Sequence, residues 1–309
     1  MSQQVIIAGC TRSGTTVLAQ ALDRHRDIFI APEMQYFNQV YGQRRFLSFV
    51  PKSRQAKMVA RFLSDQEYPA RGVFAQAKDQ ITQSYASAPS IGAAYGQILN
   101  SLSDRAVIGE KTPWHSPFAL AILRKNPNIK MIVITRHPMP TILSVMNKPG
   151  FRRVATQRQC LARWVLINRA LRRAVQVLPQ RRVMKIRYED LVQAPEAVLG
   201  DICAFLGLDF DPEVLNPRFD EAKEVAQGFV PERAEIWRKS VPEQTSQEVC
   251  ALAGSLCDWA GYSDIAPRAG LWQRMRLEAE VLLQNCAVLT MRMGLYPFGI
   301  LTRKGPKHD

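Results

Sequence analysis

The chain of 309 residues is 47% hydrophobic and carries 41 basic against 27 acidic residues, a formal net charge of +14 at pH 7. This composition supports a folded core and excludes a disordered or low-complexity protein. The positive charge favours anionic ligands or surfaces in general. Because the basic residues are scattered and match no nucleic-acid-binding motif, we expect no nucleic-acid partner. By length, the chain holds one large α/β domain or two smaller ones.

The six cysteines are spread from residue 10 to residue 286 without a CxxC pair, and the four histidines are widely separated. These spacings predict cysteines packed in the core and no metal site. No run of about 20 apolar residues, as a membrane span requires, is present. A strand is expected from residue 5, so we expect no signal peptide. The resulting prediction is a reduced, cytoplasmic protein.

The first expected element is a buried strand that runs into a glycine-bearing loop. The apolar run at 5–8 predicts the strand. Gly9 and Gly14 lie in the loop, and the apolar residues of 17–22 share one face of the helix that follows. Free N–H groups and the helix dipole make such a helix N-terminus a phosphate site. The spacing is typical of a P-loop, with an ordinary strand–turn–helix as the alternative.

This loop departs from the nucleoside-triphosphate pattern at one position. A Walker A motif ends in Gly-Lys-Ser/Thr, whereas here Gly14 is followed by Thr15 and Thr16. The lysine that would reach the β- and γ-phosphates is missing, and the cation of the loop stands earlier, at Arg12. The loop therefore indicates a phosphate-bearing nucleotide without ATP hydrolysis.

Strands and helices alternate along the next part of the chain. A second short strand is predicted at 28–30, and a largely helical insertion or lid at 40–105. A third strand is predicted at 106–109. A polar loop and a helix over about 117–125 follow it.

A central parallel strand is predicted at 130–135, where the apolar run is nearly continuous. A long amphipathic helix at 155–178, a strand at 183–187 and a helix at 195–206 follow. The alternation predicts an α/β fold of the P-loop type, with a central parallel sheet flanked by helices. Ligands of such sheets bind beyond the carboxyl ends of the strands, where the polar motifs of this chain fall.

The C-terminal part divides into a domain end and a tail. The segment 237–240 precedes a final helix that ends near residue 262, which gives a domain of 1–265 and a helical extension of 266–309. The apolar stretch 277–301 is broken by charged residues, so it does not span a bilayer. Three alternatives stay open: a helix packed on the domain, a helix packed on a second subunit of a homodimer, or a helix on a membrane surface.

Taken together, these motifs resemble those of the sulfotransferases that use 3′-phosphoadenosine 5′-phosphosulfate (PAPS). The group resembled includes bacterial enzymes, tyrosylprotein sulfotransferases and heparan-sulfate sulfotransferases. The resemblance covers roughly residues 4–263. It rests on these residues in this order: Thr11 to Thr16, Glu33, Lys111, Arg136 with Ser144, and Tyr188 to Leu191.

The resemblance implies a site for each part of the nucleotide. Arg136 and Ser144 match the pair that holds the 3′-phosphate, and Tyr188 matches a residue beside the adenine. A guanidinium and several N–H donors suit the phosphosulfate oxygens. The residues implied for the 5′-phosphosulfate are Arg12, Ser13, Gly14, Thr15 and Thr16.

The resemblance also implies catalytic residues. Glu33 resembles the glutamate that acts as general base, a role worth about 10²–10⁴-fold in rate. Lys111 resembles the lysine that offsets negative charge on the departing phosphate. His115 follows Lys111 by four residues, where it is the second candidate for the base or an acceptor contact, with capping or packing as the alternative. A surface position is the alternative for Glu33 and Lys111.

These roles predict in-line transfer of the sulfuryl group from PAPS to a hydroxyl, with an amine as the second choice, and no metal. A glycan, a glycolipid, a natural product and a peptide are all open as acceptors. We expect acceptor specificity to reside in 40–105 and in the tail. The alternatives are a P-loop kinase or NTPase with a degenerate loop, and a non-catalytic nucleotide-binding protein.

Overall fold

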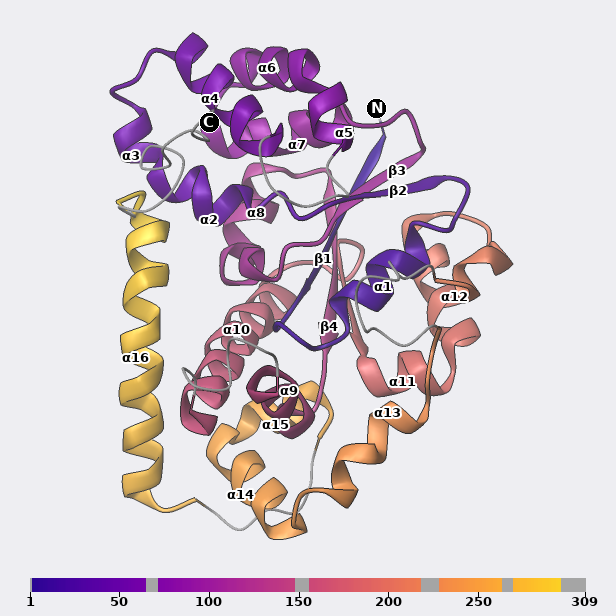
Figure 1. Ribbon diagram of the computed structural model, residues 1–309, viewed down its shortest axis with the longest axis vertical. Helices are drawn as coiled ribbons and strands as arrows, with labels where there is room; N and C mark the ends of the chain where they lie inside the picture. The colour runs from indigo at the N-terminus through magenta and orange to yellow at the C-terminus, as the bar shows by residue number, and fades with distance from the viewer. Residues whose placement is uncertain (1, 65–71, 148–155, 218–227, 263–268, 296–309) are drawn as a thin grey trace, which may run out of the picture.

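The computed structural model describes residues 2–64, 72–147, 156–217, 228–262 and 269–295 (Figure 1). In this part of the chain, five parallel strands form one sheet in the order β2-β3-β1-β4-β5. The predicted parallel α/β sheet is confirmed, and each predicted strand is present within one or two residues. The strands are β1 (Gln3–Gly9), β2 (Ile28–Ala31), β3 (Val107–Glu110), β4 (Ile129–Thr135) and β5 (Val183–Arg187).

The register of the sheet brings the predicted polar motifs to one edge. Gly9 at the end of β1 pairs with Ile134 of β4, and Ile6 pairs with Glu110 at the end of β3. Because all the strands run in the same direction, their carboxyl ends meet along this edge. The loop after β1 and the segments after β2, β3 and β4 therefore start close to one another.

Alternation along the strands divides the core into two layers. Ile6 and Ala8 of β1 pack into one hydrophobic cluster, whereas Val5 and Ile7 pack into the other. Successive strand residues point to opposite faces of a sheet, so a strand buried on both sides has a nearly continuous apolar sequence.

Helices cover both faces. One layer is formed by α1 (Thr15–Leu22), α11 (Tyr188–Gln193) and α12 (Pro195–Leu206). The helices on the other side follow β3 and β4 in the sequence, and Trp164 is a fully buried residue among them. They are η3 (Pro113–Phe118), α8 (Ala119–Lys125), α9 (Pro138–Met146) and α10 (Gln157–Val177).

The predicted helical insertion is confirmed for the described residues of 40–105. Its helices pack on one another beside the β2 edge (Figure 1), and Tyr85 donates a hydrogen bond of 2.7 Å to Gln55 between two of them. They are η1 (Tyr41–Gln43), α3 (Arg44–Leu47), α4 (Lys52–Ser64), α5 (Gly72–Gln76), α6 (Lys78–Ser87) and α7 (Ile91–Asn100), and the short helix α2 (Tyr36–Gln39) precedes them. Residues 65–71 lie outside the described part.

The single helix predicted before residue 262 is two helices in the structure. The chain breaks at Gly254, whose φ of 58° is a conformation that glycine adopts far more readily than other residues. The elements of this region are η4 (Pro212–Leu215), α13 (Glu232–Glu235), η5 (Ile236–Lys239), α14 (Glu243–Ala253) and α15 (Ser255–Ala260).

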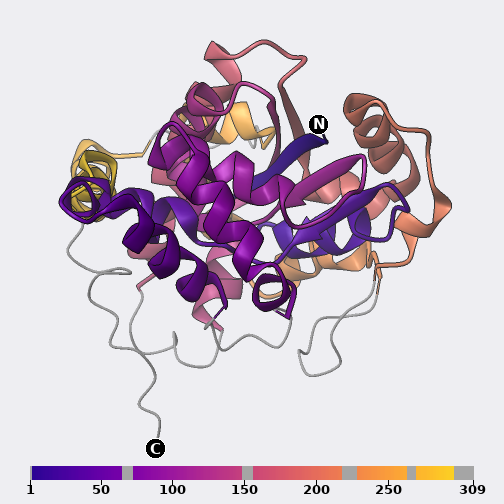
Figure 2. The same cartoon turned by 90° about the horizontal axis from the view of Figure 1, so that it is seen from above.

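The tail forms one long helix, α16 (Leu271–Met293), which begins earlier than the predicted apolar stretch and ends at Gly294. Its inner side lies along α10, where Glu278 pairs with Arg169 and Gln284 donates a hydrogen bond of 2.8 Å to the carbonyl of Gln159. Figure 2 shows this helix, in yellow, at the rim of the molecule. The tail therefore packs on the domain. Among the described helices, none combines the length and apolarity needed to cross a membrane.

We predict that Gly109→Ala destabilises the sheet. An added Cβ would lie 2.5 Å from Ile30 Cδ1 and 2.7 Å from Val5 Cγ1, so these two buried side chains would have to move. Such overpacking costs about 1–3 kcal/mol. Gly200→Ala in α12 is the matched control, because an added Cβ there meets nothing within 4 Å. It should stabilise the helix by about 0.5–1 kcal/mol. Urea unfolding of both variants measures the difference, and an unaffected Gly109→Ala protein would contradict this packing.

Candidate active site

The loop between β1 and α1 is held in an unusual conformation. Arg12 has a φ of 72° and Gly14 a φ of 94°, both in the left-handed region. An arginine in this region is uncommon, and such strain is often found in binding loops. The turn is closed from inside, because Ser13 donates from its amide at 3.1 Å and from its hydroxyl at 2.5 Å to the carbonyl of Cys10. The Ser13 side chain therefore shapes the loop and is buried.

The first turn of α1 presents backbone donors beside this loop. Gly14 is the N-cap residue, so no side chain caps the first N–H groups of the helix. Thr15 is buried and Thr16 is exposed in this turn. The uncapped N–H groups and the exposed hydroxyl of Thr16 can bind an anion.

Tyr188 packs against the loop. A Cβ on Gly14 would lie 2.3 Å from Cδ2 of Tyr188, so only glycine allows the ring to approach this closely. The guanidinium carbon of Arg136 lies 4.0 Å from the centre of the same ring. Tyr188 is only 6% exposed, so the ring supports Gly14 and Arg136 from within. A contact between Tyr188 and an adenine stays a prediction.

Arg136 is a half-buried cation whose Nε–H group is buried without a partner in the described part of the chain. It donates hydrogen bonds of 3.1 Å to the carbonyl of Arg12 and 3.2 Å to that of Arg233. Within the described part of the chain, its buried Nε has no hydrogen-bond partner. Burial lowers the pKa of this guanidinium, while Tyr188 and Glu189 partly oppose that effect. An anion would supply both the charge and the acceptor that this group lacks.

Ser144 of α9 completes this group. Its Oγ accepts a hydrogen bond of 2.8 Å from Nε of Arg12, so its own proton can be donated to a ligand. The structure thus brings Arg12, Arg136 and Ser144 together at the carboxyl edge of the sheet. We call Arg12, Gly14, Arg136, Ser144 and Tyr188 the anion cluster.

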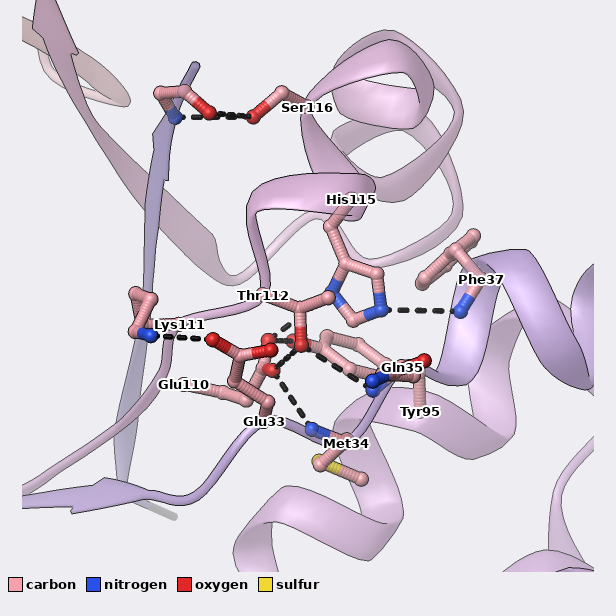
Figure 3. Close-up of polar contacts among 11 residues, drawn as sticks. Glu33, Met34, Gln35, Phe37, Tyr95, Glu110, Lys111, Thr112, His115 and Ser116 are labelled. Atoms are coloured by element: carbon pink, nitrogen blue, oxygen red, sulfur yellow. Dashed lines mark hydrogen bonds and ion pairs between the residues drawn. The ribbon is translucent and has the colours of Figure 1, made fainter. Parts of the chain in front are cut away.

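A second group of polar residues lies at the ends of β2 and β3 (Figure 3). Lys111 Nζ donates to Oε1 of Glu33 at 2.5 Å. The Lys111 side chain is 12% exposed and that of Glu33 is 35% exposed, so the carboxylate is the more accessible partner. The structure therefore places the predicted base and the predicted cation side by side.

Beneath this pair lies the buried carboxylate of Glu110, which sequence reasoning did not select. It accepts hydrogen bonds of 3.0 Å from the amide of Met34 and 2.9 Å from the hydroxyl of Tyr95, and a third from the hydroxyl of Thr112. Nδ1 of His115 lies 3.0 Å from its Oε2. Burial alone raises the pKa of Glu110, but His115, Thr112 and the Met34 amide outweigh it and hold the pKa below the ordinary value.

His115 belongs to this buried network. It is fully buried, and its Nε2 accepts a hydrogen bond of 3.1 Å from the amide of Phe37. Because Nε2 accepts, we assign the ring proton to Nδ1, which faces Glu110. The ring is fully buried, as the alternative of packing expects. A role of His115 as the base or in an acceptor contact stays a prediction.

The network fixes the segment that carries Glu33. Three backbone amides of this segment, those of Met34, Gln35 and Phe37, donate to Glu110, Thr112 and His115 in turn. Gln35 adopts a φ of 50°, again in the left-handed region. The position of the Glu33 carboxylate is therefore set by polar side chains from the segment after β3.

A serine connects the segment after β3 to the strand that leads into the anion cluster. Ser116 Oγ accepts from the amide of Gly9 and donates to its carbonyl, both at 3.0 Å. Gly9 is the last residue of β1 before the loop that holds Arg12. Figure 3 shows this bond beside the Glu110 network. The two polar groups are thus held in one frame.

A cavity of about 250 Å³ opens beside the start of the loop. Its walls come from the loop, α9, α10 and α16, so the tail takes part in this edge of the molecule. The expected part of the tail in acceptor specificity stays a prediction. The lining residues are Cys10, Thr11, Thr141, Ile142, Val145, Gln159, Cys160, Arg163, Glu280 and Gln284.

Across the described residues, no group of three or more His, Cys, Asp or Glu side chains could hold a metal ion.

Comparison with known proteins gives a consistent result. The sulfotransferase family matches residues 4–212. Protein-tyrosine sulfotransferase 2 of Gallus gallus is 24% identical over 216 residues, which are 69% of this chain and 53% of that protein. Protein-tyrosine sulfotransferase A of Caenorhabditis elegans is 24% identical over 217 residues, 69% of this chain and 52% of that protein. The chain spans about half the length of these curated relatives.

Two solved structures share the fold. The sulfotransferase domain from the curacin biosynthetic pathway aligns with a TM-score of 0.59 at 21% identity, over 86% of this chain and 99% of that chain. The sulfotransferase domain from the olefin synthase of Synechococcus PCC 7002 aligns with a TM-score of 0.56 at 22% identity, over 90% of this chain and 94% of that chain.

We predict that Thr112→Val weakens the protein in a pH-dependent way. It removes a donor to the buried Glu110 anion, which costs about 1.5–3 kcal/mol at neutral pH. The folded pKa of Glu110 is depressed, so its stabilisation is present above the ordinary carboxyl pKa of about 4.3 and is lost as the pH falls through the folded value. The difference between wild type and variant should therefore narrow in acid.

Thr135→Val is the matched control for this experiment. Thr135 is equally buried, but its hydroxyl donates only to neutral carbonyls, those of Ile186 and Ala260, both at 3.2 Å. Its replacement should cost about 0.5–1.5 kcal/mol at either pH. Urea unfolding at neutral pH and below about pH 4 compares the two variants. An equal cost of Thr112→Val at both pH values would contradict the role given to Glu110.

Proposed function

The chain belongs to the sulfotransferase family, and we propose that it transfers the sulfuryl group of PAPS to a hydroxyl of an acceptor. The observation that carries this proposal is the shared edge of the sheet. The anion cluster contains a buried arginine donor without a partner in the described part of the chain, and the glutamate–lysine pair lies at the same edge. The hydrogen bonds between Gly9 and Ser116 join the two groups.

The residues at this edge fit a nucleotide that is phosphorylated at both ends. Arg136 and Ser144 would hold the 3′-phosphate, using the free Nε and the serine proton. Arg12, Thr16 and the uncapped amides of α1 would hold the 5′-phosphosulfate. Ser13 and Thr15 are buried and would support this loop from within.

In the transfer step, Glu33 would accept the proton of the acceptor hydroxyl while the oxygen of that hydroxyl attacks sulfur. A new oxygen–sulfur bond forms as the bond from sulfur to the 5′-phosphate oxygen breaks, and that oxygen keeps the electron pair. Lys111 would then stabilise the negative charge that develops on the phosphate. Lys111 already contacts Glu33, so the proposed base and the proposed cation are adjacent at this edge of the sheet.

His115, Glu110 and Thr112 would act as positioning residues. Each of them accepts a hydrogen bond from a backbone amide of the segment that carries Glu33, and all three are buried. A general base contributes fully only when it is held within hydrogen-bond reach of its proton. The network supplies this constraint.

The acceptor class follows from the chemistry of the base. A carboxylate beside a lysine suits a hydroxyl of a glycan, glycolipid, natural product or peptide, with an amine as the second choice. The relatives from Gallus gallus and Caenorhabditis elegans are named for transfer to protein tyrosine, whose hydroxyl is one member of this class. The cavity beside Thr11 is the proposed entrance for the acceptor. A cytoplasmic location stays a prediction.

Two other functions compete with this proposal. A degenerate P-loop kinase or NTPase would bind ATP with Mg²⁺, although Thr15 stands where the Walker lysine would be. A non-catalytic protein would bind 3′-phosphoadenosine 5′-phosphate (PAP) without turnover. Nucleotide binding and the role of Glu33 separate the three.

We predict that PAP stabilises the protein more than AMP or Mg-ATP does. A ligand present at about 100 times its Kd adds about 2.7 kcal/mol to the free energy of unfolding, which is several degrees in Tm. AMP lacks the 3′-phosphate, so it should give a smaller shift. Ser144→Ala should reduce the advantage of PAP over AMP by roughly fivefold in Kd or more. Stabilisation by Mg-ATP alone would favour the kinase or NTPase.

We predict that Glu33→Gln lowers the rate of sulfuryl transfer by about 10²–10⁴-fold and leaves PAP binding intact. Glu213→Gln is the matched control, because Glu213 is also paired with a basic side chain, that of Arg24, but belongs to the η4 element. Extracts incubated with protein and PAPS are analysed by mass spectrometry for products heavier by one sulfuryl group. An unchanged rate with Glu33→Gln would remove Glu33 from its role, and PAP binding without any product would favour the binding protein.

A further inference from the structure

The outer side of α16 is a continuous apolar surface. Seven of its large hydrophobic side chains are between 43% and 74% exposed. From Trp272 to Met293, the apolar positions follow one another at intervals of three or four residues, which places them on one side of the helix. We call this side the outer stripe; it consists of Leu271, Trp272, Met275, Ala279, Leu282, Leu283, Cys286, Leu289 and Met293.

The opposite side of the same helix is also apolar. Leu277, Val281, Val288 and Met291 are buried against the domain. A helix that packs on a domain normally turns a polar side to water, whereas one that is apolar on both sides is expected to be covered on both. The outer stripe therefore marks a surface that is covered when the protein is in place.

The apolar surface continues beyond the helix. The amide of Arg45 in α3 donates to the carbonyl of Gly294 at 3.2 Å, so α3 adjoins the end of α16 (Figure 1). Phe46 is 40% exposed and Phe49 is 87% exposed here. Side chains of this size bury roughly 150–250 Å² each when fully covered. These side chains add to the apolar surface at this end of α16, and large exposed apolar patches mark interaction sites.

The helix carries three arginines and two glutamates, of which Glu280 lines the cavity beside Thr11. Helical geometry places the exposed Arg274 and Arg276 on the two sides of the outer stripe. Glu278 is neutralised by its ion pair with Arg169 of α10. Beside the Arg169–Glu278 ion pair is a groove of about 490 Å³. Arginines are the only charged residues among those that line it. Its lining is Arg169, Arg172, Arg173, Gln176, Val177, Ala253, Ser255 and Leu256.

An anionic phospholipid surface complements both features. Its acyl boundary accepts exposed Trp, Leu, Met and Phe side chains, and its headgroups attract arginines. A second copy of the chain complements only the apolar outer stripe. It carries the same formal net charge of +14 and would bring a second arginine groove to the contact. The charge distribution therefore favours a membrane over a dimer.

We propose that α16 docks the protein on an anionic membrane surface. The helix lies in the plane of the interface, with the outer stripe at the acyl boundary and the arginine groove against the headgroups. This inference is independent of the proposed sulfuryl transfer, because it concerns a surface formed by α16, α3 and α10.

The test is flotation of the full chain with vesicles of phosphatidylcholine alone or mixed with phosphatidylserine. We expect binding to the mixed vesicles that weakens with salt, and a blue shift of tryptophan emission that is lost in Trp272→Phe. The double variant Leu282→Glu/Leu283→Glu should bind at least about tenfold more weakly. Ile236→Glu is the matched control, because Ile236 is 58% exposed and lies outside the outer stripe.

A second variant tests the arginine groove alone. Arg172→Gln/Arg173→Gln should weaken binding to the mixed vesicles by roughly fivefold for each arginine, with a smaller salt dependence. Circular dichroism and the thermal shift with PAP show whether each variant is folded, and vesicle binding needs no nucleotide, so failure of the transfer proposal would be seen separately. Absence of vesicle binding by the wild-type chain would overturn the proposal. So would a dimer that Leu282→Glu/Leu283→Glu dissociates in sedimentation.

Discussion

The buried carboxylate of Glu110 is the interaction on which the candidate active site depends. A charge in the interior is costly unless donors surround it. Here Tyr95, Thr112 and the Met34 amide donate to the carboxylate, and Nδ1 of His115 lies 3.0 Å from it. Those donors come from α7, the end of β3 and the segment after β2. Satisfying one anion therefore fixes three parts of the chain relative to one another.

The anion cluster follows a different physical principle. Arg136 is held by two carbonyls and a tyrosine ring, yet its buried Nε has no partner in the described part of the chain. The Glu110 carboxylate receives its hydrogen bonds from the protein itself, whereas the buried Nε of Arg136 is left without an acceptor in the described part of the chain. Rigid support beside an incomplete anion site is the arrangement expected of a preorganised phosphate pocket.

The sheet and the meeting of Arg12 with Arg136 could be predicted from the sequence, because apolar runs mark the strands and parallel strands end at one edge. The polar network that positions the segment of Glu33 could not be predicted in this way. Tyr95 lies on an insertion helix without a motif, and only tertiary packing brings its hydroxyl to Glu110. The burial of His115 could not be predicted either, because its spacing from Lys111 along the chain does not show burial. Its role as the base or in an acceptor contact stays a prediction.

The bond between Tyr95 and Glu110 also limits how this protein can be re-engineered. Exchanging the helical insertion for that of a relative would change more than the insertion itself. Such a chimera would lose a hydroxyl that holds Glu110, and with it the segment that carries Glu33, unless the incoming segment supplies one at the same place. The insertion and the carboxyl edge of the sheet are therefore not separable modules in this chain, and graft boundaries should leave α7 with the host.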